Sequence, residues 1–480
     1  MQRFSDLMAT TQARSAADRA SSWVEIPEQL GAASHPNQLL VLNHVCIDSQ
    51  RIHFFRNATA AALFDKHKEP YRVWPGFAPA RKAPPSRAFA TTLHNSSWAR
   101  ARRSLNQSGI HVARWAEETS FLWVPHKAAA YNKFHFYNNF WLPLWLNVVL
   151  SGSEHLDKRL FLFKVWPLAP VSHVPGQVAS WPHDALHASY FYIIYKLFRE
   201  VAWPIENIWA GERAICFDRL VWSQQQTTVR YPYQAVCSYE QFYRKVSLIP
   251  SSILAIRRGM GVEQRGLPLA AENHGPSRKP SIVWISRQDA CSAQNGRTEA
   301  TGIDRCVRNL DAVLEELRRT QLFGMIRVVS DFKKHNDTSD RDAQFRHQLE
   351  AVRDSDILIG VHGAGMTHIH YLEPQGAVME LLDNYYFTNR LGSNIYQSMA
   401  RMQGCGYVGA DIRGAANTSR GYVFSPRFTA HLASVALAAW NQTQWEPHDA
   451  CCHYQPSKPV HCPRSDCKGP LNRVVALKEA

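Results

Sequence analysis

The feature that most constrains the fold is a regular alternation of apolar runs and helical patterns between residues 281 and 382. Four short runs are almost wholly apolar, as expected of strands buried on both faces of a sheet. These runs are Ser281–Ile285, Met325–Val329, Asp356–Val361 and Ala377–Leu382. Apolar residues at helical spacing lie between them, over 304–319 and 342–353. This order predicts a doubly wound α/β domain with a parallel sheet and right-handed crossovers.

The third run leads directly into a glycine-containing loop, followed by a short helical segment that ends near Leu372. The loop reads His362-Gly363-Ala364-Gly365-Met366-Thr367. Ligands of parallel sheets bind beyond the carboxyl ends of the strands, and glycines let a ligand approach the backbone. We expect the N–H groups of 364–367 to bind an anion, His362 to donate to a phosphate oxygen and Thr367 to offer its hydroxyl. The alternative is a plain tight turn that needs glycine for positive φ, but this leaves the histidine unexplained.

Other polar residues follow the neighbouring runs. Ser286 and Arg287 come after the first run and Ser330 after the second, so all three are expected at the same edge of the sheet. We expect the Arg287 guanidinium to clamp a phosphate through two hydrogen bonds. Glu380 lies within the fourth run and has two interpretations that stay open here. It is either an acceptor for ribose hydroxyls or a strand residue that faces outward.

Length and composition predict two folded domains. A chain of 480 residues is too long for one ordinary core, and 45% hydrophobic with 20% charged residues is typical of globular proteins. A stretch rich in glycine and proline marks the boundary between the domains. We expect a polar N-terminal segment over 1–30, an N-terminal domain over 31–265, a linker over 266–280, a C-terminal domain over 281–445 and a cysteine-rich tail over 446–480.

The formal net charge of +14 points to an anionic partner. The basic residues are dispersed, and the densest cluster is Arg100, Arg102 and Arg103. No run of five or six like charges and no zinc-finger or RNA-binding signature accompanies it. A small phosphate-bearing ligand fits this distribution as well as any other anion, and nucleic acid ranks last among the candidate partners.

Cysteines and glycosylation sequons favour an oxidising, secretory compartment. The chain has ten cysteines and six sequons, where chance would give about two or three. The sequons begin at Asn57, Asn95, Asn106, Asn336, Asn417 and Asn441. Disulfides are the better account of the tail cysteines, although zinc is an alternative. The first thirty residues lack the apolar core of a signal peptide, and residues 140–150 are too short for a membrane helix. We therefore expect either an anchor that this sequence lacks or a protein that is not luminal.

The motifs of the second half resemble those of glycosyltransferase family 61. The resemblance is dense from about 280 to 400 and weaker before that. It is carried by Ile285–Arg287, Arg308–Asn309, Asp356–Thr367 and Leu372–Leu381, with weaker matches at Tyr131–Phe140 and Gly211–Phe217. The family implies a GT-B fold, in which two Rossmann-like domains face each other across a cleft. It also implies a UDP-sugar donor, inversion at the anomeric carbon, and a hydroxyl of a glycan or glycoprotein as acceptor, in the Golgi or endoplasmic reticulum lumen.

The resemblance assigns the donor site to one set of residues. We expect xylose or N-acetylglucosamine as the sugar and no metal cofactor, because Arg287 and the loop would stabilise the leaving diphosphate. Two Asp-x-Asp triplets, Asp340–Asp342 and Asp354–Asp356, are interpreted as capping and loop residues. The predicted donor-site residues are Ser286, Arg287, Arg308, Asn309, Ser330, His362, Gly363, Ala364, Gly365, Met366, Thr367 and Glu380.

The catalytic base is less well defined by the sequence. Inversion needs a general base, and His135 in the 131–140 motif is the candidate. Many family members carry an aspartate four residues later, where this chain has Asn139, and an amide cannot act as a base. Asp157 or Asp184 could serve instead, His135 could be an ordinary core histidine, or the protein could bind sugar nucleotides or glycans without turnover.

Overall fold

The computed structural model divides the chain into two compact units, Met1–Val229 and Arg230–Ala480. The described residues are 22–25, 38–55, 58, 61–62, 90–123, 136–154, 157–162, 193–202, 213–223, 248–262, 278–286, 306–330, 338–382, 395–418, 421–443 and 474–477.

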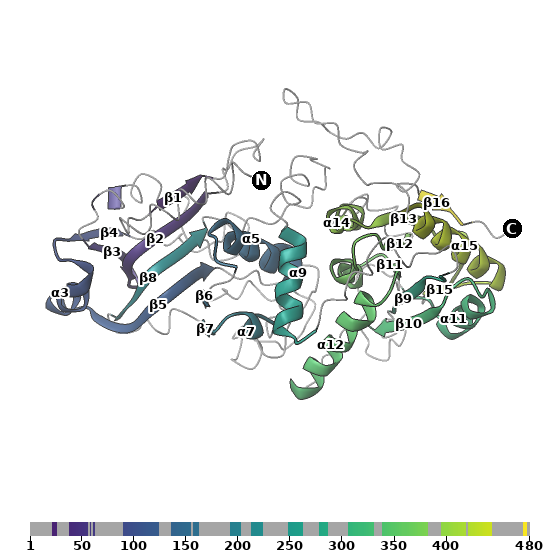
Figure 1. Ribbon diagram of the computed structural model, residues 1–480, viewed down its shortest axis with the longest axis horizontal. Coiled ribbons are helices and arrows are strands. Elements are labelled where there is room, and N and C mark those ends of the chain that lie inside the picture. Colours follow the sequence, from purple (N-terminus) through teal and green to yellow (C-terminus); the bar gives the residue numbers. More distant parts are fainter. Residues whose placement is uncertain are drawn as a thin grey trace, which may run out of the picture. The chain divides into compact units, whose positions relative to one another are not determined.

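The C-terminal unit is built on a six-stranded sheet in the order β10-β9-β11-β12-β13-β16, and all neighbouring strands are parallel (Figure 1). The four strands that the apolar runs predict are all present. The order reverses between β9 and β11, which makes that edge the switch point where ligands of open α/β sheets bind. The strands are β9 (Ser281–Ser286), β10 (Met325–Ser330), β11 (Ile357–Val361), β12 (Ala377–Leu382), β13 (Gly406–Asp411) and β16 (Val474–Ala476).

Helices cover both faces of this sheet, as the doubly wound prediction requires. One face packs against α11 and α15, and alternate strand residues such as Trp284, Ile359 and Met379 point to them. The other face is covered by η8, which contacts α9, α12 and α14. Because strand side chains alternate, Gly360 and Glu380 belong to this second face. The helices are α9 (Leu248–Gly259), α11 (Leu310–Arg319), α12 (Thr338–Arg353), the 3₁₀ helix η8 (Ala364–Tyr371), α14 (Ile395–Gln403) and α15 (Pro426–Thr443).

The helix expected from residue 304 begins only at Leu310, because the preceding residues pair with another segment. The Tyr422 N–H donates to the Cys306 carbonyl at 2.8 Å, and the Arg308 N–H donates to the Tyr422 carbonyl at 2.8 Å. Tyr422 lies in a hairpin of β14 (Ala416–Thr418) and β15 (Gly421–Val423). This pairing fixes residues 306–308 in an extended form that is incompatible with a helix.

The predicted domain boundaries differ from these contacts in three places. β1 (Ser22–Glu25) lies in the segment expected to be a polar end and pairs with β2, and β16 lies in the predicted cysteine-rich tail. Helix α9 lies in the range predicted for the N-terminal domain but packs within the second unit, where the buried Arg257 donates to Glu373 Oε1 at 2.6 Å. The tail cysteines and most of the predicted linker lie outside the described residues.

The N-terminal unit has an eight-stranded mixed sheet, in which β2 runs antiparallel to β3 and β8 and the β8-β5-β6-β7 part is parallel. The main order is β4-β3-β2-β8-β5-β6-β7, with β1 beside β2. The strands are β2 (Gln38–Ile47), β3 (Arg51–Phe55), β4 (Ala90–His94), β5 (His111–Trp123), β6 (Lys158–Leu162), β7 (Glu200–Ala202) and β8 (Arg213–Ser223). A short helix, α7 (Ile194–Leu197), precedes β7.

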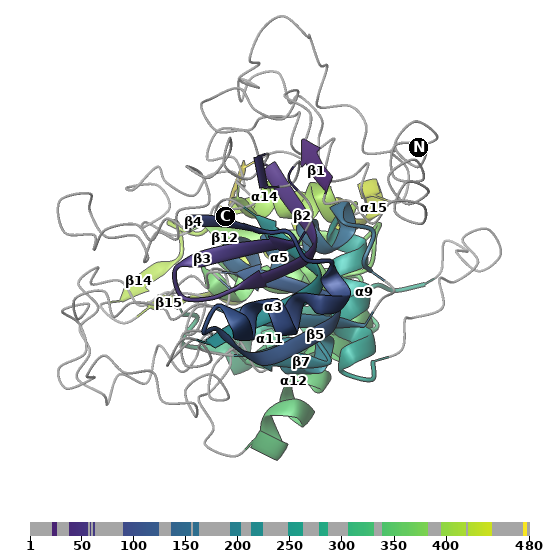
Figure 2. The same cartoon turned by 90° about the vertical axis from the view of Figure 1, so that its left-hand side faces the viewer.

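One face of this sheet is covered by α3 (Ala101–Gln107), which follows the single 3₁₀ turn η3 (Trp98–Arg100); Figure 2 looks onto this end of the unit. Ala101 and Leu105 pack in one cluster with Cys46 and Cys216, which form a disulfide between β2 and β8. Cys306 of the other unit is also disulfide-bonded. Among the described helices, none is both long and apolar enough to cross a bilayer.

A chain of hydrogen bonds ties β3 and β4 to α3. Asp48 Oδ2 lies 3.0 Å from His53 Nε2, and His53 Nδ1 lies 3.1 Å from His94 Nε2. His94 Nδ1 in turn lies 3.2 Å from Ser104 Oγ on α3. Burial lowers the pKa of His94, and the charge of His53 lowers it further. The folded state therefore favours neutral His94.

Removing the disulfide with Cys46→Ala and Cys216→Ala should destabilise the N-terminal unit. The cross-link joins residues 170 positions apart, and loss of a cross-link of this kind costs about 2–5 kcal/mol. Urea unfolding followed by tryptophan fluorescence measures the change. Cys405→Ala, at a buried thiol with no cross-link, is the control. An equal loss of stability in both variants would contradict a stabilising role for the cross-link.

His94→Gln should reduce the acid sensitivity of folding. The unfolded chain protonates His94 near its ordinary pKa of about 6.5, whereas the folded state resists protonation. The contribution of neutral His94 is therefore complete above that pKa and is lost as the pH falls through the lower folded-state pKa. Melting temperatures from pH 8 to pH 5 should fall less steeply in His94→Gln than in the exposed control His111→Gln. Equal slopes would show that His94 does not carry the effect.

Candidate functional site

The loop after β11 is held in a backbone conformation that depends on glycine. Gly363 has φ 150° and ψ −177°, a combination open essentially to glycine alone. Its carbonyl accepts hydrogen bonds from the Tyr396 hydroxyl at 2.5 Å and from the Met366 N–H at 2.9 Å. The loop thus turns sharply from the strand into η8, at the carboxyl edge of the sheet that the sequence predicts and beside the switch point between β9 and β11.

Met366 and Thr367 are the residues of this loop that pack into the protein interior. Both are fully buried, and a Cβ atom on Gly360 would lie 2.8 Å from Met366 Sδ and 3.0 Å from Ile285 Cβ. The missing side chain at Gly360 therefore makes room for the Met366 thioether. The sequence prediction placed the Thr367 hydroxyl and the Met366 N–H on a ligand. In the structure the Met366 N–H donates to the Gly363 carbonyl, within the turn, and the Thr367 side chain is fully buried.

A buried polar triad lies beside the loop. Glu380 Oε1 is hydrogen-bonded to His362 Nδ1, and the Tyr407 hydroxyl donates to Glu380 Oε2. Glu380 is 1% exposed, so it is not an outward-facing strand residue. Its partners in register on β11 and β13, Gly360 and Gly409, have no side chains to crowd the carboxylate. Both carboxylate oxygens contact protein groups, and the geometry therefore fits orientation of the His362 ring by Glu380.

Three of the supporting residues carry no signal in the sequence pattern. Tyr396 lies on α14, Tyr407 on β13 and Gln348 on α12, far from the loop along the chain. His368 joins η8 to α12, since its Nδ1 lies 2.7 Å from the Gly365 carbonyl oxygen and its Nε2 lies 3.1 Å from Gln348 Oε1. Only His368, three residues beyond Gly365, could have been marked from the sequence.

The serines that follow the first two strands lie at the same edge. Ser286 ends β9 and Ser330 ends β10, and the two are partners in register. Ser286 is buried. Arg287 and the candidate base His135 lie outside the described residues, and the side chains of Ser330, Ala364 and Asn139 are not described. The backbone of Asn139 belongs to a π-helical turn, η5 (Tyr137–Trp141), that continues into α5 (Leu142–Leu150).

Arg308 and Asn309 immediately precede α11. Because α11 follows β9 along the chain, its first residues lie at the carboxyl edge of the sheet. Asn309 uses both ends of its amide on the backbone of Phe424, with Nδ2 donating to the carbonyl at 2.8 Å and Oδ1 accepting from the N–H at 3.0 Å. This side chain thus fastens the β14–β15 hairpin to α11. Gly421 allows the close approach, since a Cβ atom there would lie 2.7 Å from Cys306 Sγ. Arg308 is exposed.

The second Asp-x-Asp triplet lies at the opposite edge of the sheet. Asp356 Oδ2 accepts hydrogen bonds from the Ser281 N–H and hydroxyl, both at 2.8 Å, and Arg278 Nη2 donates to the same carboxylate. These contacts join the beginnings of β9 and β11. The capping and loop role expected for this triplet agrees with the contacts, while the side chains of Asp340 and Asp342 are not described.

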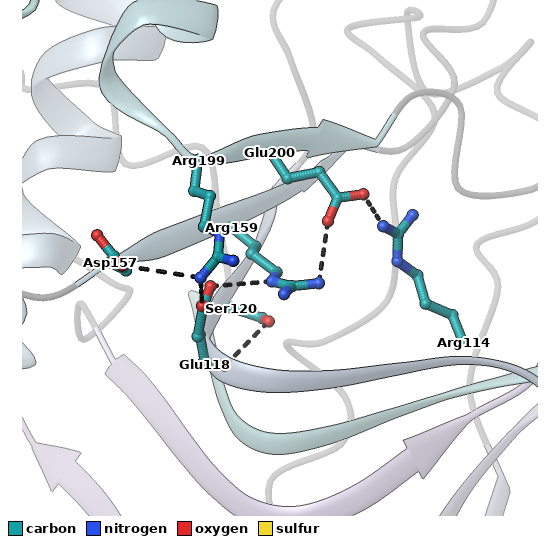
Figure 3. A network of polar contacts seen from close by, with 7 residues as sticks. All are labelled: Arg114, Glu118, Ser120, Asp157, Arg159, Arg199 and Glu200. Carbon is teal, nitrogen blue, oxygen red and sulfur yellow. Dashed lines mark hydrogen bonds and ion pairs between the residues drawn. The ribbon is translucent and has the colours of Figure 1, made fainter.

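Asp157, a candidate base, belongs to an ion-pair network in the N-terminal unit (Figure 3). The network ties the amino-terminal ends of β6 and β7 to β5. Arg159 contacts Glu118 and Glu200 at 3.0 Å each, and Arg199 pairs with Glu118 and lies 3.8 Å from Asp157. The Asp157 side chain is 76% exposed beside this arginine. Its position and its cationic neighbour argue against a base, and Asp184 lies outside the described residues.

Comparison with known proteins gives a family match and a group of relatives. Residues 133–379 match the family described as Glycosyltransferase 61. The chain is also similar to proteins named EGF domain-specific O-linked N-acetylglucosamine transferase. The Drosophila melanogaster protein is 33% identical over 132 residues, which cover 28% of this chain and 20% of that protein. The Rattus norvegicus protein is 33% identical over 93 residues, covering 19% and 16%. The matched stretch thus spans a fifth or less of these relatives.

The family match covers more than half of the chain and includes both the 131–140 motif from residue 133 onward and the whole loop after β11. It ends one residue before Glu380, and Tyr407 lies beyond it. The resemblance predicted from the sequence motifs is therefore confirmed: this chain belongs to the glycosyltransferase 61 family.

Proposed function

We propose that this protein transfers a sugar, with inversion, from a UDP-sugar to a hydroxyl group of a glycan or glycoprotein. The observation that carries the proposal is the loop at residues 362–367, at the switch point of a parallel sheet. A glycine-dependent turn there brings backbone and His362 to the edge where nucleotides bind in such folds. Family membership supports a glycosyltransferase, and the names of the relatives favour N-acetylglucosamine over xylose as the first donor to test.

The donor site in this proposal consists of the loop, Arg287 and the ends of β9 and β10. His362 Nδ1 is engaged by Glu380, so a hydrogen bond to a phosphate oxygen would come from Nε2. A histidine oriented by a buried carboxylate keeps a fixed ring position and tautomer, as in the supporting shells of other sites. Arg287 would neutralise the diphosphate as it leaves, and the proposal includes no metal cofactor.

The proposal also specifies a domain arrangement and a general base. The proposal includes a GT-B arrangement, in which the N-terminal unit would supply the acceptor side and His135 the general base.

The disulfides and the sequons support a secretory compartment, the Golgi or endoplasmic reticulum lumen. A sugar-nucleotide-binding protein without turnover is the second candidate, and Asn139 at the position of the family's aspartate is what favours it.

His362→Ala should weaken UDP binding by about 1.5–3 kcal/mol, which is about 10- to 150-fold in Kd, because a charge-assisted contact is lost. Arg287→Ala should have an effect of the same order. Isothermal titration calorimetry with UDP measures both, and His347→Ala, at an exposed histidine of α12, is the matched control. Normal UDP binding in both test variants would show that the donor site is wrong. Release of UDP from UDP-N-acetylglucosamine with acceptor then separates an enzyme from a binding protein, and His135→Ala should abolish that release while preserving UDP affinity.

Tyr407→Phe should weaken UDP binding through His362 and not independently of it. Loss of the hydroxyl removes one of two contacts that hold the Glu380 carboxylate, so the His362 ring loses its fixed orientation. A double-mutant cycle tests this: adding Tyr407→Phe to His362→Ala should cause little further loss of affinity, whereas its effect should add fully to that of His347→Ala. Additive losses with His362→Ala would contradict the coupling.

A further inference from the structure

Three arginines of η3 and α3 point away from the sheet and line one open hollow. Arg100, Arg102 and Arg103 are all exposed, whereas Ala101 and Leu105 on the other side of the helix are buried against the sheet. The described residues that complete the hollow are uncharged: Ala99, Asn106 and Gln107. We call the three arginines the α3 basic face.

The α3 basic face differs from other arginines of this unit in how it contacts the described carboxylates. Arg114, Arg159 and Arg199 each pair with a glutamate in the network between β5 and β7 (Figure 3). Within the described part of the chain, no ion pair involves an arginine of the α3 basic face. Three like charges in one hollow repel one another, and a bound anion would relieve that repulsion.

The α3 basic face rests on a fixed aromatic layer. The Arg102 guanidinium lies 5.6 Å from the centroid of the Trp115 ring, in cation–π contact. The indole N–H groups of Trp98 and Trp115 donate to Asp218 Oδ1 at 3.0 and 3.4 Å. His44, in the middle of β2, has φ 58° and stacks on Trp98 with centroids 5.2 Å apart. Backbone conformations of this kind persist where the surroundings fix them, often at binding sites.

We propose that the α3 basic face binds an acidic glycan, whose carboxylate or sulfate groups pair with the three arginines. The planar guanidinium matches both groups through paired hydrogen bonds. The half-buried rings of Trp98 and Trp115 beside the arginines suit the apolar C–H faces of sugar rings. The choice of a glycan as occupant rests on the proposed function, because it makes the α3 basic face a contact for the acceptor or for a nearby part of it.

A membrane surface fits these observations less well. Insertion into a bilayer needs exposed apolar side chains beside the cations. The exposed Leu93 of β4 is the neighbour of His94, which bonds to α3, so Leu93 points to the opposite side of the sheet. Nucleic acid would need a longer basic track than three residues on two short turns to bind firmly.

Binding of heparin, polygalacturonate and neutral dextran to the full chain tests the proposal, at about 0.1 M salt to limit screening of the charges. Replacing all three arginines of the α3 basic face with glutamine should raise the Kd for both acidic glycans about tenfold or more, because charge-assisted contacts are lost. Dextran should bind neither protein. A control with the same change in net charge replaces exposed arginines of the C-terminal unit and should bind as the unaltered chain does: Arg258→Gln, Arg318→Gln and Arg319→Gln.

Two further variants sharpen the result. Arg102→Lys keeps the charge but loses the planar fork, so it should bind heparin less tightly than the unaltered chain and more tightly than Arg102→Gln. Asn106→Gln removes the sequon in the hollow without changing its charge and should not weaken binding. Equal affinity of the triple variant and the unaltered chain, or an equal loss in the C-terminal control, overturns the proposal. Binding of duplex DNA or phosphatidylserine vesicles as tight as that of the acidic glycans, and equally dependent on the arginines, overturns it as well.

The test also separates this inference from the proposed function. The triple variant should bind UDP like the unaltered chain, because its changes lie in the N-terminal unit and the proposed donor site lies in the C-terminal one. Loss of heparin binding with intact UDP binding supports the α3 basic face. A chain that binds heparin through these arginines but does not bind UDP supports the face and refutes the donor site.

Discussion

The arrangement of the C-terminal unit depends on one buried carboxylate. Glu380 lies in a strand that is otherwise apolar, and burying an ionisable group is costly unless its oxygens are hydrogen-bonded. His362, which follows β11, and Tyr407, which lies on β13, supply those bonds. These two strands flank the strand that carries Glu380. Because the Glu380 carboxylate must be hydrogen-bonded, β12 has to lie beside His362, at the start of the 362–367 loop. The same contact that stabilises the sheet thereby orients the histidine at the ligand edge.

Close approach of backbone and side chains is the second constraint on the carboxyl edge of this sheet. Gly360 and Gly421 stand where a Cβ atom would collide, with Met366 in one case and with Cys306 in the other. Gly363 stands where the backbone adopts a conformation that other residues avoid. Gly360 lets η8 pack against the sheet, and Gly421 lets the β14–β15 hairpin pack against the segment that precedes α11. The family match covers η8, whereas the hairpin lies beyond the matched residues.

The N-terminal unit is organised around contacts across one face of its mixed sheet. The Cys46–Cys216 disulfide and the histidine pair at 53 and 94 both lie beneath α3, and they link the helix to β2, β3, β4 and β8. The three arginines of the α3 basic face are exposed and form no ion pair with a described residue, whereas the arginines between β5 and β7 pair with glutamates (Figure 3). Two sets of arginines in one unit thus have different roles, one structural and one open to a ligand.

The sequence by itself determined the parallel sheet of the second unit and the position of the 362–367 loop at the carboxyl edge of that sheet. Buried parallel strands must be apolar along their whole length, so their periodicity is visible in the chain, and their carboxyl ends mark the site. It also predicted the family, because the loop motif places His362 at the end of the strand, where plain turn geometry requires glycine but no histidine. Two residues around that histidine could not be predicted, because the Tyr396 ring contacts His362, and the Tyr407 hydroxyl contacts Glu380, only after distant elements pack together. Tertiary structure alone decided that Glu380 is buried, that Met366 and Thr367 anchor the loop, and that Asn309 fastens a hairpin. Each of these depends on contacts between residues that are distant in the sequence, and the spacing of residues along the chain does not predict such contacts.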